Sequence, residues 1–351
     1  MPHSRYLIGS IPWYSVLIVT GMALAIFLAS KKEEKAGFPR DTVVDLCLIM
    51  IPVAILCARL YYVAFAWDTY RDHPLSILAI WEGGLAIYGG ILGGILTVIL
   101  FARRRHLSAC ALLDLLMPGV SLAQSIGRWG NFFNMEAYGL EVTDSRFQFF
   151  PLAVQIPEGT GTVWHLATFF YESVWDLIVF LTLSLLIRKR ARRHGDVFVW
   201  YMLLYAAGRL VIEGLRMDSL MLGSLRVSQL LAALMCLGVP AFFLLRPPRP
   251  HADLRALWKT VLLFCLQMLL FAVLPRPAAE QPAAPWLFFA LVCLISVPGT
   301  MKTLPRLALM LLAWSLYLFL APLSDTCFSL VYACVSLALS CAAWHTDIVS
   351  A

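Results

Sequence analysis

Polar residues gather in one short stretch of this otherwise apolar sequence, GRWGNFFNMEAYG at residues 127–139. It places Arg128, Asn131, Asn134 and Glu136 directly after a long hydrophobic run. A charged side chain costs roughly 2.5–3.5 kcal/mol at the centre of a membrane helix, so charges at such positions indicate a functional site. An interfacial arginine that snorkels beside helix-capping asparagines is the structural alternative.

A second polar group, Arg209, Glu213 and Arg216, lies in the sequence GRLVIEGLRMD. Spacings of four and seven place the three side chains on one helical face. A neutralising arginine–glutamate pair inside a helix bundle is the structural interpretation. Two arginines to one glutamate leave a surplus positive charge, however, and this suits an anionic lipid headgroup.

Two tyrosines are further candidates. Tyr88 lies in EGGLAIYGGILGG at residues 82–94, where GxxxG pairs predict close helix packing. The unperturbed pKa of tyrosine is about 10, which makes it a poor base at pH 7. Either Tyr88 is activated by Arg128 or Arg209, or it only donates a hydrogen bond and the base lies elsewhere. Tyr14 opens the first hydrophobic run, where an ordinary interfacial tyrosine is the alternative.

The composition is that of an integral membrane protein. Hydrophobic residues make up 61% of the 351 residues, charged residues 14%, and the mean hydropathy is +0.80. Soluble domains average about 45–50% apolar and about 25% charged residues, which excludes a soluble globular protein. The net charge of +6 is spread over connecting segments, so it indicates membrane topology and no nucleic-acid partner.

The hydrophobic runs predict an all-α polytopic protein with a seven-span core and about four extra C-terminal spans. A Pro-rich segment, PPRPHADLRAL, separates the two parts. We therefore expect a core at 1–246, a cytoplasmic linker at 247–257 and an accessory helical region at 258–351. The core spans are expected near 12–30, 41–66, 85–102, 109–127, 166–187, 197–214 and 226–246, and the further spans near 258–275, 286–300, 307–322 and 326–343.

Every second connecting segment is basic, and the positive-inside rule therefore places the N-terminus outside the cell. The outward segments are then 67–84, 128–165 and 215–225, of which the longest is expected to form an irregular external substructure. The sequence has no HExxH, CxxC or P-loop motif, so we expect neither a metal nor a cofactor.

The stretch at 127–139 resembles the signature of the prolipoprotein diacylglyceryl transferase family, and the other motifs follow in that family's order over roughly residues 10–246. The resemblance implies an enzyme that moves the diacylglyceryl group of phosphatidylglycerol to the lipobox cysteine of a prolipoprotein signal peptide. The products would be a thioether and glycerol phosphate, in the first step of lipoprotein maturation. It also implies a bacterial plasma (inner) membrane location, with the active site at the outer face.

The resemblance implies a role for each matched residue. Arg128 would bind the lipid phosphate, while Glu136 would position Arg128 or a water. Tyr88 replaces the histidine that is thought to be the base in the best-known members. In the motif ATFFYES, Tyr171 and Glu172 fit the family, but Ala167 replaces a proline and His165 comes one residue early. The implied catalytic residues are Tyr88, Arg128, Arg209 and Glu213, and the implied substrate-binding residues are Tyr14, Asn131, Asn134, Glu136, Gly139 and Arg216.

Two other functions compete with this interpretation. Tyr88 is compatible with a non-catalytic relative that binds anionic lipid or lipoprotein signal peptides. A small-molecule transporter would require polar or broken helices near the membrane midplane, often in related halves. The charges here cluster at one interface instead, which disfavours transport. Residues 247–351 have no counterpart in the family.

Overall fold

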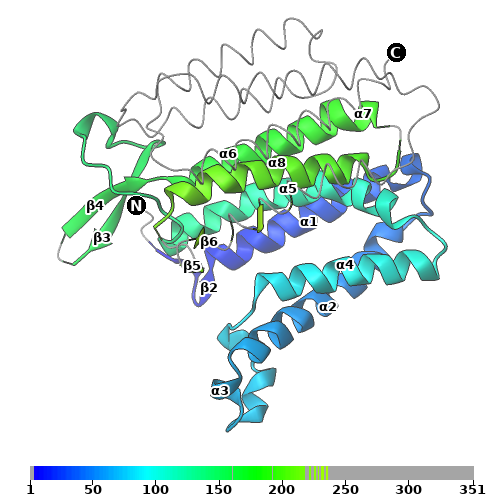
Figure 1. Ribbon diagram of the computed structural model, residues 1–351, viewed down its shortest axis with the longest axis horizontal. Coiled ribbons are helices and arrows are strands. Elements are labelled where there is room, and N and C mark those ends of the chain that lie inside the picture. The colour runs from blue at the N-terminus through cyan, green and yellow to red at the C-terminus, as the bar shows by residue number, and fades with distance from the viewer. Residues whose placement is uncertain are drawn as a thin grey trace, which may run out of the picture. The chain divides into compact units, whose positions relative to one another are not determined.

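A computed structural model describes residues 4–159, 161–191 and 193–217, together with 221–222, 225–226, 228, 231–232 and 235. Most of the expected seventh span, and all of residues 247–351, lie outside the described residues. The described part is mostly helical, and six of its helices are long and apolar enough to cross a membrane (Figure 1). They are α1 (Trp13–Glu33), α2 (Thr42–Phe65), α4 (Ile87–Arg104), α5 (Ala109–Asn134), α6 (Thr168–Leu181) with its continuation η5 (Thr182–Ile187), and α8 (Asp196–Leu215).

These six helices confirm the first six expected spans, with one correction. We expected the fourth span to end at residue 127, but α5 continues to Asn134. Arg128 and Asn131 therefore lie on the last two turns of a helix and not in an external loop. The prediction placed the end of the helix where the polar residues begin. A helix can continue past that point, because the end that leaves the apolar layer is amphipathic and carries polar side chains.

Short elements connect the spans. The described residues also form three two-stranded antiparallel sheets, which the all-helical prediction did not include. Segments outside the apolar layer can satisfy their backbone hydrogen bonds in such hairpins. The hairpins are β1 (Tyr6–Ile8) with β2 (Ile11–Pro12), β3 (Ala153–Glu158) with β4 (Gly161–Leu166), and β5 (Met221–Leu222) with β6 (Leu225–Arg226). The remaining elements are η1 (Glu34–Ala36), α3 (Trp67–Tyr70), η2 (Pro74–Leu78), η3 (Ile80–Glu82), η4 (Ser145–Phe147) and α7 (Arg188–Arg190).

The segment before β3 carries an exposed acid–base pair. The carboxylate of Asp144 accepts hydrogen bonds from the guanidinium and the backbone N–H of Arg146, with a shortest distance of 2.6 Å. These hydrogen bonds hold the pKa of Asp144 below its usual value. The pair caps η4 and fixes the local turn.

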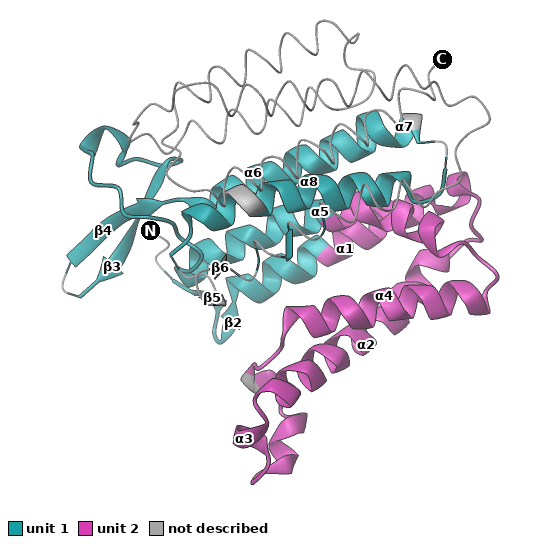
Figure 2. Ribbon diagram, in the orientation of Figure 1, with its two compact units in different colours: residues 1–21, 121–351 teal, residues 22–120 magenta. Residues whose placement is uncertain are grey.

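The chain divides into two compact units (Figure 2). Unit 1 comprises residues 1–21 and the described residues from 121 onward, and unit 2 comprises residues 22–120. Both α1 and α5 contribute to each unit.

Close packing of α2 on α4 dominates unit 2. A Cβ atom built on Gly93 would lie 2.7 Å from Cys57 Cβ, and one on Gly89 would lie 2.9 Å from Ala58 Cα. A Cβ on Gly94 would approach Met50 Cγ only to 4.0 Å. The Gly89/Gly93 pair therefore lets the two helices approach, which confirms close packing for that pair of glycines.

The connection between α2 and α4 is organised around one arginine. Arg59 is buried on α2, and its guanidinium donates to the carbonyl oxygens of Ser76, Ile77 and Gly83 at 2.7–2.8 Å. A planar group with five donors can satisfy several turn carbonyls at once. Arg59 thus has a structural role in this connection.

Candidate active site

The end of the polar stretch joins α6 and α8. The hydroxyl of Thr168, at the start of α6, donates to the Ala137 carbonyl at 2.7 Å. The N–H of Gly139 donates to Leu166 O at 2.9 Å, and the N–H of Leu140 donates to Leu215 O at 3.0 Å. One short segment after α5 therefore fixes the first turn of α6 and the last turn of α8 beside each other.

Gly139 is required in this junction for lack of space. A Cβ atom at this position would lie 2.8 Å from the Leu166 Cβ, the Leu215 carbonyl oxygen and the Thr168 Cγ2. Of these neighbours, Leu215 is the last residue of α8 and Thr168 is the first residue of α6. Any larger residue would push the helices apart, which gives Gly139 a steric role in the junction. Its expected part in substrate binding stays a prediction.

Serine side chains hold α5 against α6. Ser125 Oγ donates to the Ser173 carbonyl, and Ser173 Oγ donates to the Ser125 carbonyl, both at 2.8 Å. Ser121 Oγ donates to the Asp176 carbonyl, also at 2.8 Å. Such small polar residues allow close helix approach within a membrane bundle. This contact brings Arg128, on the next turn of α5, level with Glu172 on α6.

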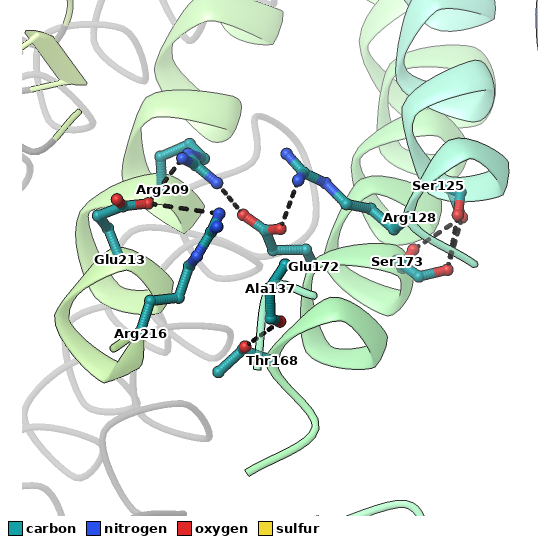
Figure 3. A network of polar contacts seen from close by, with 9 residues as sticks. All are labelled: Ser125, Arg128, Ala137, Thr168, Glu172, Ser173, Arg209, Glu213 and Arg216. Carbon is teal, nitrogen blue, oxygen red and sulfur yellow. Dashed lines mark hydrogen bonds and ion pairs between the residues drawn. The ribbon is translucent and has the colours of Figure 1, made fainter. Parts of the chain in front are cut away.

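A chain of alternating charges crosses the three helices (Figure 3). Glu172 lies between two arginines: Arg128 Nη1 is 2.9 Å from its Oε2, and Arg209 contacts its Oε1. Arg209 Nη2 is also 2.6 Å from Glu213 Oε2, and Arg216 Nη1 is 3.9 Å from the same atom. The order is therefore Arg128, Glu172, Arg209, Glu213, Arg216, from α5 through α6 to the end of α8.

The arrangement of charges favours an anionic ligand. The glutamate side chains are 3–4% exposed, whereas the three arginines are 13–21% exposed. The carboxylates thus form the buried side of the network, and three arginines to two glutamates leave one positive charge. Guanidinium groups bind phosphates through two parallel hydrogen bonds, so an accessible, fixed set of arginines suits a phosphodiester.

A second group of predicted residues lies at the end of α5. Asn134 Nδ2 donates to Glu136 Oε1 at 3.1 Å, and the Glu136 N–H donates to the Asn131 carbonyl at 3.0 Å. Tyr14, on the first turn of α1, packs against Gly130 of α5, where an added Cβ atom would lie 3.2 Å from Tyr14 Cα. The carboxylate that contacts Arg128 is Glu172, because the serine contacts place α6 beside Arg128. The expected role of Glu136, to position Arg128 or a water, stays a prediction.

Comparison with known proteins decides the family. The sequence model of the prolipoprotein diacylglyceryl transferases matches residues 5–245. The chain belongs to this family. It is therefore a multi-pass membrane protein, in agreement with its six apolar helices.

Curated relatives of this family named phosphatidylglycerol–prolipoprotein diacylglyceryl transferase are closely similar. That of Limosilactobacillus reuteri (strain DSM 20016) is 46% identical over 230 residues, which are 64% of this chain and 82% of the relative. That of Bacillus cereus (strain G9842) is 43% identical over 251 residues, 69% of this chain and 90% of the relative. The Bacillus anthracis (strain CDC 684 / NRRL 3495) protein has the same identity and coverage.

Nine of the ten site residues that the family resemblance predicted belong to unit 1, and Tyr88 belongs to unit 2. Tyr88 lies on the first turn of α4, where its ring centroid is 6.5 Å from that of Tyr61. Tyr88 stays a predicted catalytic residue of this transferase-family chain.

The sequence prediction did not include Glu172 among the site residues, although its motif was matched. A glutamate within an apolar span is itself the sequence signal that could have identified it. His165, for which no role was expected, is buried beside Gly139. Its Nδ1 is 3.0 Å from the Gly139 carbonyl and its Nε2 is 3.0 Å from Glu158 Oε1. The ring thus holds the β3–β4 hairpin against the family signature.

Proposed function

We propose that this chain is a phosphatidylglycerol–prolipoprotein diacylglyceryl transferase of a bacterial inner membrane. Family membership over residues 5–245, together with an arginine network built on three membrane helices, supports this proposal. The donor is phosphatidylglycerol, and the acceptor is the lipobox cysteine of a prolipoprotein signal peptide.

In the proposed site, Arg128, Arg209 and Arg216 bind the donor phosphodiester. Glu172 holds Arg128 and Arg209 in place before the lipid arrives, so little rearrangement is needed on binding. Charge that develops on the departing phosphate oxygen then meets fixed guanidinium groups in a poorly solvated site, where such interactions are strongest.

The transfer is a substitution at a glycerol carbon of the donor. The cysteine thiolate forms the new carbon–sulfur bond, the carbon–oxygen bond to phosphate breaks, and its electron pair leaves with glycerol phosphate. The thiol proton, whose ordinary pKa is about 8.5, leaves with the product or to water. Tyr88 is the predicted residue that assists this deprotonation, and Glu136 is predicted to position Arg128 or a water.

The charge pattern of the loops supports the placement of this site at the outer face of the membrane. Basic segments after the first, third and fifth spans favour a cytoplasmic position for those connections. The end of α5, the start of α6 and the end of α8 then face outward. Prolipoprotein cysteines emerge on the same side, which makes the orientation compatible with the reaction.

Product formation by the purified protein tests the proposal. Full-length protein in detergent is mixed with phosphatidylglycerol and a synthetic lipobox peptide, and a matched peptide carries serine in place of cysteine. We expect a thioether-linked diacylglyceryl peptide and glycerol phosphate with the cysteine peptide alone. If both substrates bind but no product forms, while a histidine-bearing relative turns over in parallel, the proposal is wrong and the chain is a binding protein.

A further inference from the structure

The first turn of α1 packs on the end of α5. A Cβ atom on Gly130 would lie 3.2 Å from Tyr14 Cα, and the Trp13 ring stacks on Phe133 with centroids 4.9 Å apart. The β1–β2 hairpin then folds back, because the Trp13 N–H donates to the Arg5 carbonyl at 3.2 Å. These contacts bring Arg5 over the last residue of α5.

Arg5 begins a directed chain of hydrogen bonds. Its Nε donates to Asn134 Oδ1 at 3.0 Å, and Asn134 Nδ2 donates to Glu136 Oε1 at 3.1 Å. A guanidinium has donors only, and an ionised carboxylate has acceptors only. The amide of Asn134 therefore satisfies both neighbours in one orientation, with its oxygen toward Arg5 and its nitrogen toward Glu136.

We propose that Arg5 is a positioning residue of the transferase site, which acts through Asn134 to hold the Glu136 carboxylate in place. Without Arg5 the amide oxygen of Asn134 loses its partner, so the amide is held at its nitrogen end only and no longer fixes the direction of its hydrogen bond to Glu136. The Glu136 carboxylate, which accepts from Asn134 Nδ2, is then held less firmly beside the end of α5. This inference rests on the proposed function, and it assigns a role to a segment that precedes the first membrane span.

A double-mutant cycle in the transfer assay tests this inference. Arg5→Ala should lower kcat/KM about tenfold, the size expected for one hydrogen bond that involves a charged group. Asn134→Ala should cause a similar loss, and the Arg5→Ala/Asn134→Ala protein should lose little more than Asn134→Ala alone, since both act on Glu136 through one path. Arg5→Lys, which retains a charged donor, should recover most of the activity. Arg146→Ala removes another exposed arginine of unit 1 and serves as the matched control with unchanged activity.

The outcomes separate this inference from the proposed function. If the wild-type protein forms no thioether, the proposed function is wrong and the inference fails with it. If the wild-type protein is active and Arg5→Ala is equally active, or if the two losses multiply in the double variant, Arg5 does not act through Asn134. A loss of activity that follows a fall in thermal stability, with no recovery in Arg5→Lys, would also overturn the inference, because it would mean that Arg5 only stabilises the hairpin.

Discussion

At the scale of single residues, Glu172 links two arginines that lie 81 positions apart in the sequence, Arg128 and Arg209. A carboxylate that is 3% exposed is stabilised in a membrane bundle only by such partners. The arginines are predictable from the sequence, because charges within apolar spans are rare. The pairing is not, because which helices are neighbours depends on tertiary packing.

Glu172→Gln should weaken both stability and turnover. The amide keeps the shape of the side chain but leaves Arg128 and Arg209 without a carboxylate between them, and removal of one partner from a buried ion pair costs roughly 3–5 kcal/mol. Thermal unfolding in detergent and the kcat/KM of transfer would measure the two effects. Glu141→Gln, at an exposed position of unit 1, is the control. Wild-type stability and turnover in Glu172→Gln would show that the network is not needed.

At the scale of elements, the site depends on the junction of α5, α6 and α8. The backbone at Gly139 is closely surrounded in this junction, with no space for a Cβ atom. Its N–H donates to the carbonyl oxygen of Leu166, at the end of β4. The sequence motif identified Gly139 as a site residue without giving the reason. Steric contact with Leu215 and Thr168 supplies that reason, and it requires the folded arrangement of segments far apart in the chain.

Gly139→Ala should destabilise the protein by about 1–3 kcal/mol, as overpacking in a filled core does. The added methyl group would separate the ends of α6 and α8, so transfer should fall as well. Gly161→Ala is a matched control, because a Cβ atom there meets nothing within 4 Å. The melting temperatures and initial rates of the two variants would be compared directly. Equal behaviour of both would refute the steric role of Gly139.

Helix α4, which packs on α2, also carries both a crowded glycine and a glycine with space for a Cβ atom. Gly93→Ala would place a methyl group 2.7 Å from Cys57 Cβ, whereas the nearest atom to one at Gly94 is Met50 Cγ at 4.0 Å. We expect Gly93→Ala to lower the melting temperature. Gly94→Ala should be neutral or stabilising by up to about 1 kcal/mol, since alanine favours helix over glycine. The reverse order of melting temperatures would contradict this packing.

At the scale of the whole molecule, hydropathy predicted the membrane class and the first six spans, because apolar length alone decides them. The hairpins were not predicted, since their pairs form outside the apolar layer. The motifs indicated the family but not the route by which Arg5 reaches Asn134, because that contact depends on the fold of the N-terminal segment. The division into core, linker and accessory region at 1–246, 247–257 and 258–351 stays a prediction.

Truncation after residue 246 tests that division. The family match ends at residue 245, and the catalytic and binding residues that we propose all lie before it. We expect residues 1–246 to retain transfer with a KM for phosphatidylglycerol close to that of the full chain. Thioether formation by the truncated protein in detergent is the measurement. A folded but inactive truncated protein would show that the C-terminal region contributes to the reaction.

The kcat/KM of Arg128→Ala tests the central claim most directly, because Arg128 begins the charge network and lies in the family signature. The measurement is thioether formation from phosphatidylglycerol and a lipobox peptide, with Arg71→Ala, an exposed arginine of unit 2, as the control. We expect a folded Arg128→Ala protein whose kcat/KM falls about a hundredfold or more, the usual effect of removing a group that stabilises transition-state charge. Turnover equal to that of Arg71→Ala would contradict the assignment of the arginine network as the donor-phosphate site.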